Sequence, residues 1–165
     1  MTKKIMKKIM LLGVLAASIL TSCDDTRKVL HDQYLEYVMH TDSLDVVHDA
    51  MSVRHDALKT DTRTLSQKLK DVEETDSIAI ADLAKHQVLL KQQAASLGKL
   101  KKLIESHADV KTYFMSDSIS VEDMEAQLLE MEANNSDIAA RLTKIKTELK
   151  MIEKEQESLK KPETH

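Results

Sequence analysis

Residues 121–159 read VEDMEAQLLEMEANNSDIAARLTKIKTELKMIEKEQESL and decide the fold. Apolar residues recur here in alternating steps of three and four, and two members of the series are polar. The series is Val121, Met124, Leu128, Met131, Asn135, Ile138, Leu142, Ile145, Leu149, Ile152, Gln156 and Leu159. Such steps place successive residues on one side of an α-helix, as in a coiled-coil seam. We therefore predict one continuous helix, unbroken by the polar run at residues 134–136.

Asn135 is a polar residue inside this seam. A polar side chain at such a position can fix the register between helices at a cost in stability. We therefore expect Asn135→Leu to raise the midpoint of thermal unfolding. If Asn135 instead faces water at a local bend, leucine should change little. A clear drop in stability would indicate a hydrogen-bond network around the amide.

Two earlier stretches also have helical periodicity. Residues 28–72 carry an apolar series that Arg54 and Thr62 interrupt, and residues 78–115 carry leucines at seven-residue intervals. The first series is Leu44, Val47, Met51, Leu58, Leu65, Leu69 and Val72. The second is Leu83, Leu90, Leu97 and Ile104, widened by Leu89, Leu100 and Leu103. A wide stripe is typical of a helix that touches two neighbours.

The composition agrees with an all-α fold. The chain has only two glycines, one proline and no tryptophan, whereas a sheet protein needs turn residues at regular spacing. Three helices of similar length with short links favour antiparallel neighbours. We predict an antiparallel three-helix bundle with coiled-coil-like packing over residues 28–160, followed by a frayed tail at 161–165. The alternative is an extended coiled coil that forms a homo-oligomer.

Capping chemistry predicts where the helices begin. Ser120 can cap the third helix with Asp123 as the acid of a capping box, and Ile119 and Met124 stand at the hydrophobic-staple positions. Residues 75–77 offer caps for the second helix. The similar run at residues 41–43 lies inside the first helix and is expected to kink it.

The aromatic residues are predicted to gather at one end of the bundle. If the first reversal centres near residue 75, Tyr37 lies beside Tyr113 and Tyr34 near Met115. The second reversal then brings Phe114 close to Met124. We expect these rings to form a closing layer of the core. The alternative is a patch that faces a membrane or a partner, because tyrosine is frequent at such boundaries.

The N-terminus predicts export. Four lysines within residues 3–8 precede a short apolar run at residues 9–20, which is too short to span a bilayer. The run ends in Leu20, Thr21, Ser22 and Cys23, an order that resembles the lipobox of bacterial lipoproteins. The resemblance implies cleavage of residues 1–22 before Cys23. It also implies a diacylglyceryl group on the Cys23 thiol and an N-acyl chain on the freed amine.

Such lipids make the membrane the first expected partner, because two or three acyl chains anchor a protein firmly. Residues 23–27 would then be a lipidated tether. Removing residues 1–22 takes four of the 24 basic residues and none of the 28 acidic ones, which leaves a net charge of -8. This charge argues against nucleic acid as a partner. We expect the envelope of a Gram-negative bacterium, and the outer membrane rather than the inner one, with the face left open.

The body of the chain resembles a group of small helical lipoproteins of Bacteroidota that carry the automatic label "viral A-type inclusion protein". The likeness rests on residues 46–51, VVHDAM, and on an aromatic–methionine end to the second helix at Tyr113, Phe114 and Met115. Tryptophan is common at the second place in that group and is absent here. The resemblance implies an envelope protein and supplies no catalytic residues.

The sequence contains no pattern for catalysis or for a metal site. His48 and His55 stand two helical turns apart, too far for one metal, and we expect surface or partly packed histidines. Nucleophile elbows and phosphate loops are missing. We therefore expect a non-enzymatic protein without a cofactor, whose bundle serves a protein partner or a structural role. The alternative is a carrier or chaperone-like module with an apolar cavity lined by Met51, Leu90, Leu97 and Leu142.

Overall fold

The computed structural model describes residues 23–71, 77–116 and 118–160. These residues form three long helices and contain no strand. The helices are α2 (Cys23–Lys70), α3 (Ser77–Phe114) and α4 (Val121–Lys160). All three pack against one another, and α2 has the more extensive contacts with both neighbours. The predicted all-α three-helix bundle is confirmed.

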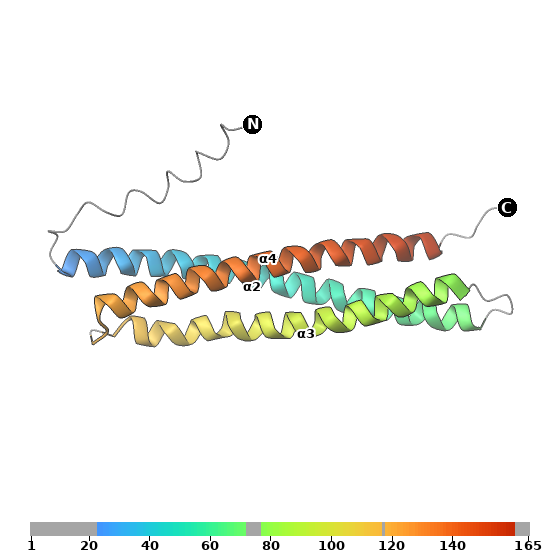
Figure 1. Ribbon diagram of the computed structural model, residues 1–165, viewed down its shortest axis with the longest axis horizontal. Coiled ribbons are helices and arrows are strands. Elements are labelled where there is room, and N and C mark those ends of the chain that lie inside the picture. Colours follow the sequence, from blue (N-terminus) through green and yellow to red (C-terminus); the bar gives the residue numbers. More distant parts are fainter. Residues whose placement is uncertain (1–22, 72–76, 117, 161–165) are drawn as a thin grey trace, which may run out of the picture.

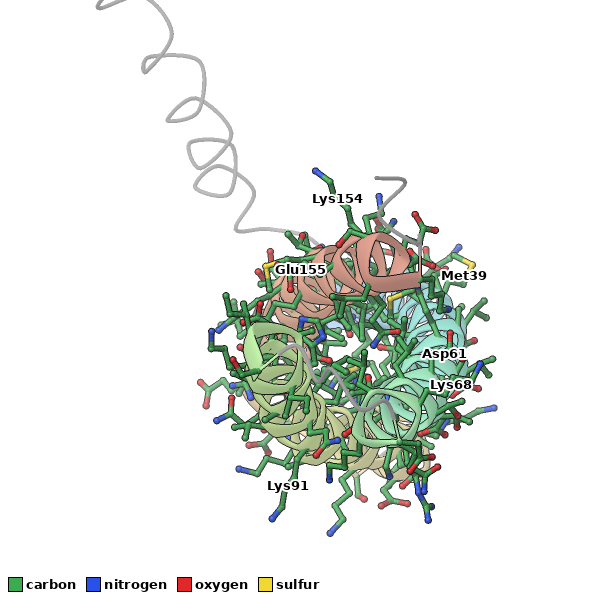
Figure 2. The ribbon with its side chains drawn as sticks, turned by 90° about the vertical axis from the view of Figure 1, so that its right-hand side faces the viewer. Met39, Asp61, Lys68, Lys91, Lys154 and Glu155 are labelled. Carbon is green, nitrogen blue, oxygen red and sulfur yellow. The ribbon has the colours of Figure 1, made fainter. Side chains whose placement is uncertain are left out.

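The three helices lie along one common axis, which is horizontal in Figure 1. Helix α2 runs from left to right, α3 returns antiparallel to it, and α4 again runs parallel to α2. Seen along that axis, the three helices surround a shared interior (Figure 2). An extended coiled coil with one continuous first helix does not describe this chain, because α2 and α3 fold back on each other.

The predicted cap at the start of α4 is confirmed. The backbone N–H of Asp123 donates to Ser120 Oγ at 3.0 Å, and the Ser120 hydroxyl donates to the Asp123 carboxylate at 2.7 Å. Ile119 and Met124 are both buried in the same core cluster, as a hydrophobic staple requires. Residues 75 and 76, the other predicted caps, lie outside the described residues.

Two polar runs lie within helices. Residues 134–136 continue α4 without a break, as predicted. Residues 41–43, where the sequence indicated a kink, do not break the first helix, because α2 continues through them. The Ser43 hydroxyl donates to the Met39 carbonyl, four residues earlier, which satisfies it within the helix. The Thr41 hydroxyl lies 2.9 Å from the Tyr37 carbonyl oxygen and equally close to Asn135 Oδ1 of α4.

Helix α2 begins earlier than expected. Residues 23–27, predicted to be a tether, already form its first turns. Arg27 lies against the α3–α4 connection just before α4 begins, and its guanidinium donates to the Ile119 carbonyl at 2.5 Å. The frayed tail expected at residues 161–165 lies outside the described residues.

The core consists of two clusters, one in the middle of the bundle and one at the end that holds the α3–α4 connection. The central cluster comprises Leu44, Met51, Leu58, Leu90, Leu97, Leu100, Ile104, Ile138, Leu142, Ile145, Leu149 and Ile152. The end cluster comprises Leu30, Tyr34, Phe114, Ile119, Met124, Leu128 and Met131. Almost every predicted seam residue of α4 is buried, and Asn135 and Gln156 are buried with them.

The predicted core face of α2 is wrong in part. Val47 is exposed, and Thr62, which had looked like an interruption, is completely buried. Between residues 41 and 62, the buried series of α2 is Thr41, Leu44, His48, Met51, His55, Leu58 and Thr62. Its members are alternately polar and apolar. The apolar pattern of the sequence therefore indicated Val47 as a core residue in place of the neighbouring His48. The true series has the same steps of three and four as the seam of α4.

Candidate functional surface and buried polar layers

The proposed lipid site stands at the start of the described chain. Cys23 is the first residue of α2, and its side chain lies outside the described part. Leu20, Thr21 and Ser22 lie outside the described residues altogether. Among the described helices, none has a stretch apolar and long enough to cross a bilayer.

His48 and His55 are buried, which corrects the expectation of surface or partly packed histidines. Their exposed fractions are 5% and 3%. His48 Nε2 lies 3.0 Å from the Leu97 carbonyl oxygen, and His55 Nε2 lies 2.8 Å from that of Leu90. A nitrogen facing a carbonyl donates to it. Each ring therefore fixes α2 to the backbone of α3, one heptad apart on both helices.

The other nitrogen of each ring faces an acidic neighbour. His48 Nδ1 lies 3.0 Å from Asp49 Oδ1, and His55 Nδ1 lies 3.1 Å from Asp56 Oδ1. Both partners of each ring are acceptors, so a ring protonated on both nitrogens can donate to both. The hydrogen bond from His48 is the main reason that the pKa of the Asp49 carboxyl is lowered, and Lys101 adds to it.

Asp45, His48 and Asp49 lie close enough to form a metal-ligand set, with ligand atoms within 4.8 Å of one another. The ammonium of Lys101 already stands among them, 2.6 Å from Asp45 and 3.5 Å from Asp49. The hydrogen bond to Asp45 raises the pKa of Lys101, which keeps this ammonium charged. The cluster is therefore neutralised by the protein's own cation, and we assign no metal to it.

A chain of hydrogen bonds crosses all three helices around Asn135. Thr41 Oγ1 lies 2.9 Å from Asn135 Oδ1 and 3.0 Å from His107 Nδ1. Asn135 Nδ2 donates to the Tyr37 carbonyl at 3.1 Å, and Asn134 Nδ2 lies 3.3 Å from His107 Nε2. The seam amide therefore has the hydrogen-bond network that the sequence left open.

One protonation state satisfies this chain completely. If His107 is neutral with its proton on Nδ1, it donates to Thr41, and the Thr41 hydroxyl donates to Asn135. Nε2 of the ring then accepts from Asn134. Burial lowers the pKa of His107, and Glu130 opposes this only in part. The neutral ring that the network needs is thus the form that burial favours.

A second polar pair repeats the first one three heptads further along the bundle. Gln156 Nε2 donates to Thr62 Oγ1 at 2.5 Å. In the first pair, the Thr41 hydroxyl donates to the Asn135 amide oxygen. Both pairs join α2 to α4. The amide oxygen of Gln156 is buried without a hydrogen-bond partner. These pairs fix the register of two parallel helices, since a shift of one heptad would separate both.

The α3–α4 contact uses polar pairs as well. His86 Nε2 lies 2.5 Å from Glu155 Oε2, and Gln93 Nε2 donates to Glu148 at 3.0 Å. His86 and Gln93 are buried, whereas Glu155 is half exposed at the rim. Together with His107 and Asn134, these pairs are spaced by seven and then fourteen residues along each helix. The buried polar groups therefore serve helix register, and they converge on no common point where a substrate would bind.

The aromatic residues meet at one end, and the core interpretation is confirmed for two of them. Tyr34 and Phe114 are each 1% exposed and stack with ring centroids 4.5 Å apart. His31 meets Phe114 edge-on at 5.5 Å. Tyr37 is half-buried and packs against the same cluster. The side chain of Tyr113 lies outside the described part, so its predicted contact with Tyr37 stays a prediction.

The four residues proposed to line a carrier cavity pack together instead. Met51, Leu90, Leu97 and Leu142 belong to one core cluster with exposed fractions of 9% or less. The grooves between helices lie at the surface. One of them, between α2 and α3, has a floor of His55 and Leu90 with Lys59, Arg63 and Lys91 at its edges.

The outer face of α2 is unusual because it carries no charge over a long distance. Its members are Met39, Ser43, Val46, Ala50, Val53, Ala57, Thr60, Thr64 and Gln67, and all are exposed. We call this set the α2 outer face. Val46 and Val53 have exposed fractions of 71% and 72%. Figure 2 shows Met39 pointing away from the bundle interior.

Charges interrupt the corresponding face of the other two helices. Among uncharged residues such as Val88 and Ala133, the outward positions include Lys85, Lys99, Lys102 and Asp109 on α3, and Asp123, Glu130, Asp137, Lys144 and Lys154 on α4. In a chain with 32% charged residues, an uncharged exposed stripe is a candidate contact surface. Sequence reasoning missed it, although its alternating steps of three and four were visible. The misplaced Val47 series had obscured which side of α2 faces outward.

Comparison with protein-family models, with curated proteins and with solved structures finds no match in any of the three.

Proposed function

We propose that this chain is a lipid-anchored envelope protein of a Gram-negative bacterium, without enzymatic activity, whose bundle binds another protein through the α2 outer face. The observation that carries the proposal is the long exposed stripe on α2 that no charge interrupts, whereas charged residues interrupt the corresponding stripes of α3 and α4. Exposed apolar side chains such as Val46 and Val53 cost solubility unless a partner covers them. A binding role accounts for the uninterrupted stripe that they form on α2.

The anchor part of the proposal rests on the sequence. Residues 20–23 have the lipobox order, and Cys23 is the only cysteine of the chain. Lipid on this residue stands at the first turn of α2, directly before the bundle. Acyl chains would therefore hold one end of the bundle at the membrane, with the outer membrane as the proposed location.

The carrier hypothesis has no comparable support. A carrier needs a cavity, and the residues proposed to line it pack against one another in the core. An apolar ligand would have to separate the helices and break the histidine–carbonyl contacts between α2 and α3. A partner at the outer face requires neither change.

The anchor is tested by metabolic labelling with a lipid precursor. We expect wild type to incorporate the label and Cys23→Ala to remain an unlabelled, uncleaved precursor. A wild-type chain that takes no label would refute the anchor, and so would an alanine variant that still takes it.

The binding surface is tested with a photo-crosslinking residue placed in native envelopes. Val46 on the α2 outer face is the test position, and Val88 on α3 is the matched control, because both are exposed valines. We expect a discrete crosslinked product from Val46 and none from Val88. Equal products from both positions, or none from either, would contradict a binding role for this face.

A further inference from the structure

We propose that the partner of the α2 outer face is a second copy of this chain, and that the two α2 helices pack against each other antiparallel. This inference rests on the proposed function, since it names the protein that the outer face binds. It follows from the side chains within the face and from the charges along its two edges.

The face has the chemistry of a helix-pairing seam. Its members alternate in steps of four and three, and small residues such as Ser43, Ala50 and Ala57 alternate with Val46, Val53 and Thr60. Small side chains let two helix backbones approach closely. From Met39 to Gln67 the seam is about 42 Å long at the helical rise. A helix of similar length with the same spacing is its natural complement, and α2 itself has both.

The first edge of the seam changes sign along the helix. Asp42, Asp49 and Asp56 occupy its N-terminal part, and Arg63 and Lys70 its C-terminal part. All five are exposed, and the side chains of Asp49 and Asp56 are 64% and 76% exposed. Such a row is complementary to itself only when the second copy runs in the opposite direction.

Antiparallel pairing brings opposite charges together along both edges. With Ala57 of one copy against Thr60 of the other, Asp56 lies near the second copy's Arg63 and Asp49 near its Lys70. On the other edge, Arg54 meets Asp61 of the second copy. In the chain itself, Arg54 pairs with Glu153 and Asp61 with Lys160. Pairing of two copies would therefore join these bridges into networks of four alternating charges.

Parallel pairing in register gives a less favourable result. Residues at the two edges of parallel helices meet across the seam with an offset of five positions. Asp56 would then face Asp61 of the second copy and Arg63 would face Lys68, and only Asp49 would face an opposite charge, that of Arg54. Like charges at such positions select against an arrangement. The charge pattern therefore favours the antiparallel pair.

The arrangement determines where the two lipid anchors lie. In the antiparallel register, Cys23 of the two copies stands at opposite ends of the pair, about 110 Å apart by helical rise. A pair with both anchors in one membrane must therefore lie along the membrane surface.

The test uses the full chain in its native envelope with one added cysteine and a short thiol crosslinker. Thr60 stands near the two-fold axis, so Thr60→Cys is expected to crosslink to the same residue of the second copy. Val46→Cys would be about 38 Å from its counterpart by helical rise and should stay monomeric. The chain without an added cysteine gives the baseline that Cys23 contributes.

Charge exchange then tests the register. In the Thr60→Cys chain, Asp56→Arg or Arg63→Asp alone should lower the yield of crosslinked dimer by about tenfold, because like charges then meet twice. The double exchange should restore the yield. As the seam control, Ala57→Glu should abolish the dimer, and Ala95→Glu on the outward side of α3 should leave it unchanged.

The other outcomes distinguish the pairing, its register, the proposed function and the anchor. Equal crosslinking from Thr60→Cys and Val46→Cys would establish a parallel pair, and failure of the double exchange would refute the register. A Thr60→Cys product of the mass of this chain plus a different protein would refute self-pairing while the proposed function stands. A chain that takes no lipid label and still forms the Thr60→Cys dimer would refute the anchor alone.

Discussion

At the scale of single residues, the interior of the bundle is unusually rich in polar side chains. Every second core position in this part of α2 is polar, at seven-residue intervals: Thr41, His48, His55 and Thr62. A buried polar group is costly unless it is hydrogen-bonded. Each of these side chains has a partner on a neighbouring helix, so the cost is offset and the contact becomes specific for one register.

Because Asn135 is hydrogen-bonded to α2, we expect its replacement by leucine to lower the stability of the protein, the opposite of the effect expected from the sequence. Asn135→Leu leaves Thr41 without its acceptor on α4 and forces a larger side chain into a position that is 1% exposed. We expect the free energy of unfolding to fall by about 1–3 kcal/mol, from the lost hydrogen bonds and from overpacking. Urea denaturation of the two proteins measures this difference.

A companion variant separates the hydrogen bond from the packing. Thr41→Val removes the other partner, and the double variant should lose less than the sum of the two single losses. Full additivity would show that the two side chains do not interact. A higher unfolding midpoint for Asn135→Leu would show instead that the buried amide lowers the stability of the protein.

His107 gives the bundle a defined pH dependence. Burial lowers its pKa below the usual value of 6.5, so the unfolded chain binds the proton more readily than the folded one. Its stability contribution is therefore complete above pH 6.5. It is lost as the pH falls from there through the lowered pKa. We expect the unfolding midpoint of wild type to decrease on acidification across this window.

His107→Gln is the control, because glutamine keeps hydrogen-bonding capacity and does not titrate there. The variant should lose less stability than wild type between pH 7.5 and about pH 5.5, the window that a histidine of lowered pKa covers. Identical pH profiles of the two proteins would exclude His107 as the source.

At the scale of elements, the helix ends depend on local chemistry. The Ser120 side chain accepts the backbone N–H of Asp123, and the acid lies in the first turn of α4, where it also favours the helix dipole. We expect Ser120→Ala to lower the free energy of unfolding by about 1 kcal/mol, the usual loss for an N-cap. Thermal or urea unfolding measures it.

Ser136 provides the matched control for the cap. It is an exposed serine in the interior of α4, where alanine is the better helix former. Ser136→Ala should therefore leave stability unchanged or raise it slightly. A loss equal to that of Ser120→Ala would mean that serine removal in general, and not the cap, is responsible.

The register between elements depends on contacts that are far apart in sequence. Two ion pairs between α2 and α4, Arg54–Glu153 and Asp61–Lys160, stand one heptad apart with their signs reversed. A slip of one heptad would bring like charges together. Surface pairs add little stability, and their value here is that they disfavour the neighbouring registers.

At the scale of the whole molecule, the antiparallel α2–α3 contact has a measurable register. The Lys101 ammonium lies 2.6 Å from the Asp45 carboxylate across these two helices. In a Cys23→Ser chain, Asp45→Cys with Lys101→Cys should therefore form an intramolecular crosslink with a short reagent. Electrophoresis without reductant, or mass spectrometry of the digest, detects it.

The control pair is Asp45→Cys with Lys91→Cys, which moves the second thiol about 15 Å along α3 by helical rise. This pair should not form the short intramolecular crosslink. Crosslinks only between molecules, or equal yields from the two pairs, would contradict the bundle and its register.

The sequence by itself determined the elements of this protein. The seam of α4, its cap at Ser120 and the continuity through Asn135 could all be read from it, since helix periodicity and capping involve residues at most four positions apart. The end cluster of Tyr34 and Phe114 followed from helix length and chain reversal. The seam, the cap and the continuity need no knowledge of which helices become neighbours, whereas the end cluster needs the antiparallel order of α2 and α3.

Only the tertiary structure decided which side of α2 is inside. His48 and His55 belong to the core because the carbonyls of Leu97 and Leu90 accept their protons, and those partners are 49 and 35 residues away in the chain, respectively. A polar residue is buried when a distant group satisfies it. Once His48 faces inward, Val46 and its uncharged neighbours must face out, so the candidate binding surface also depended on the fold.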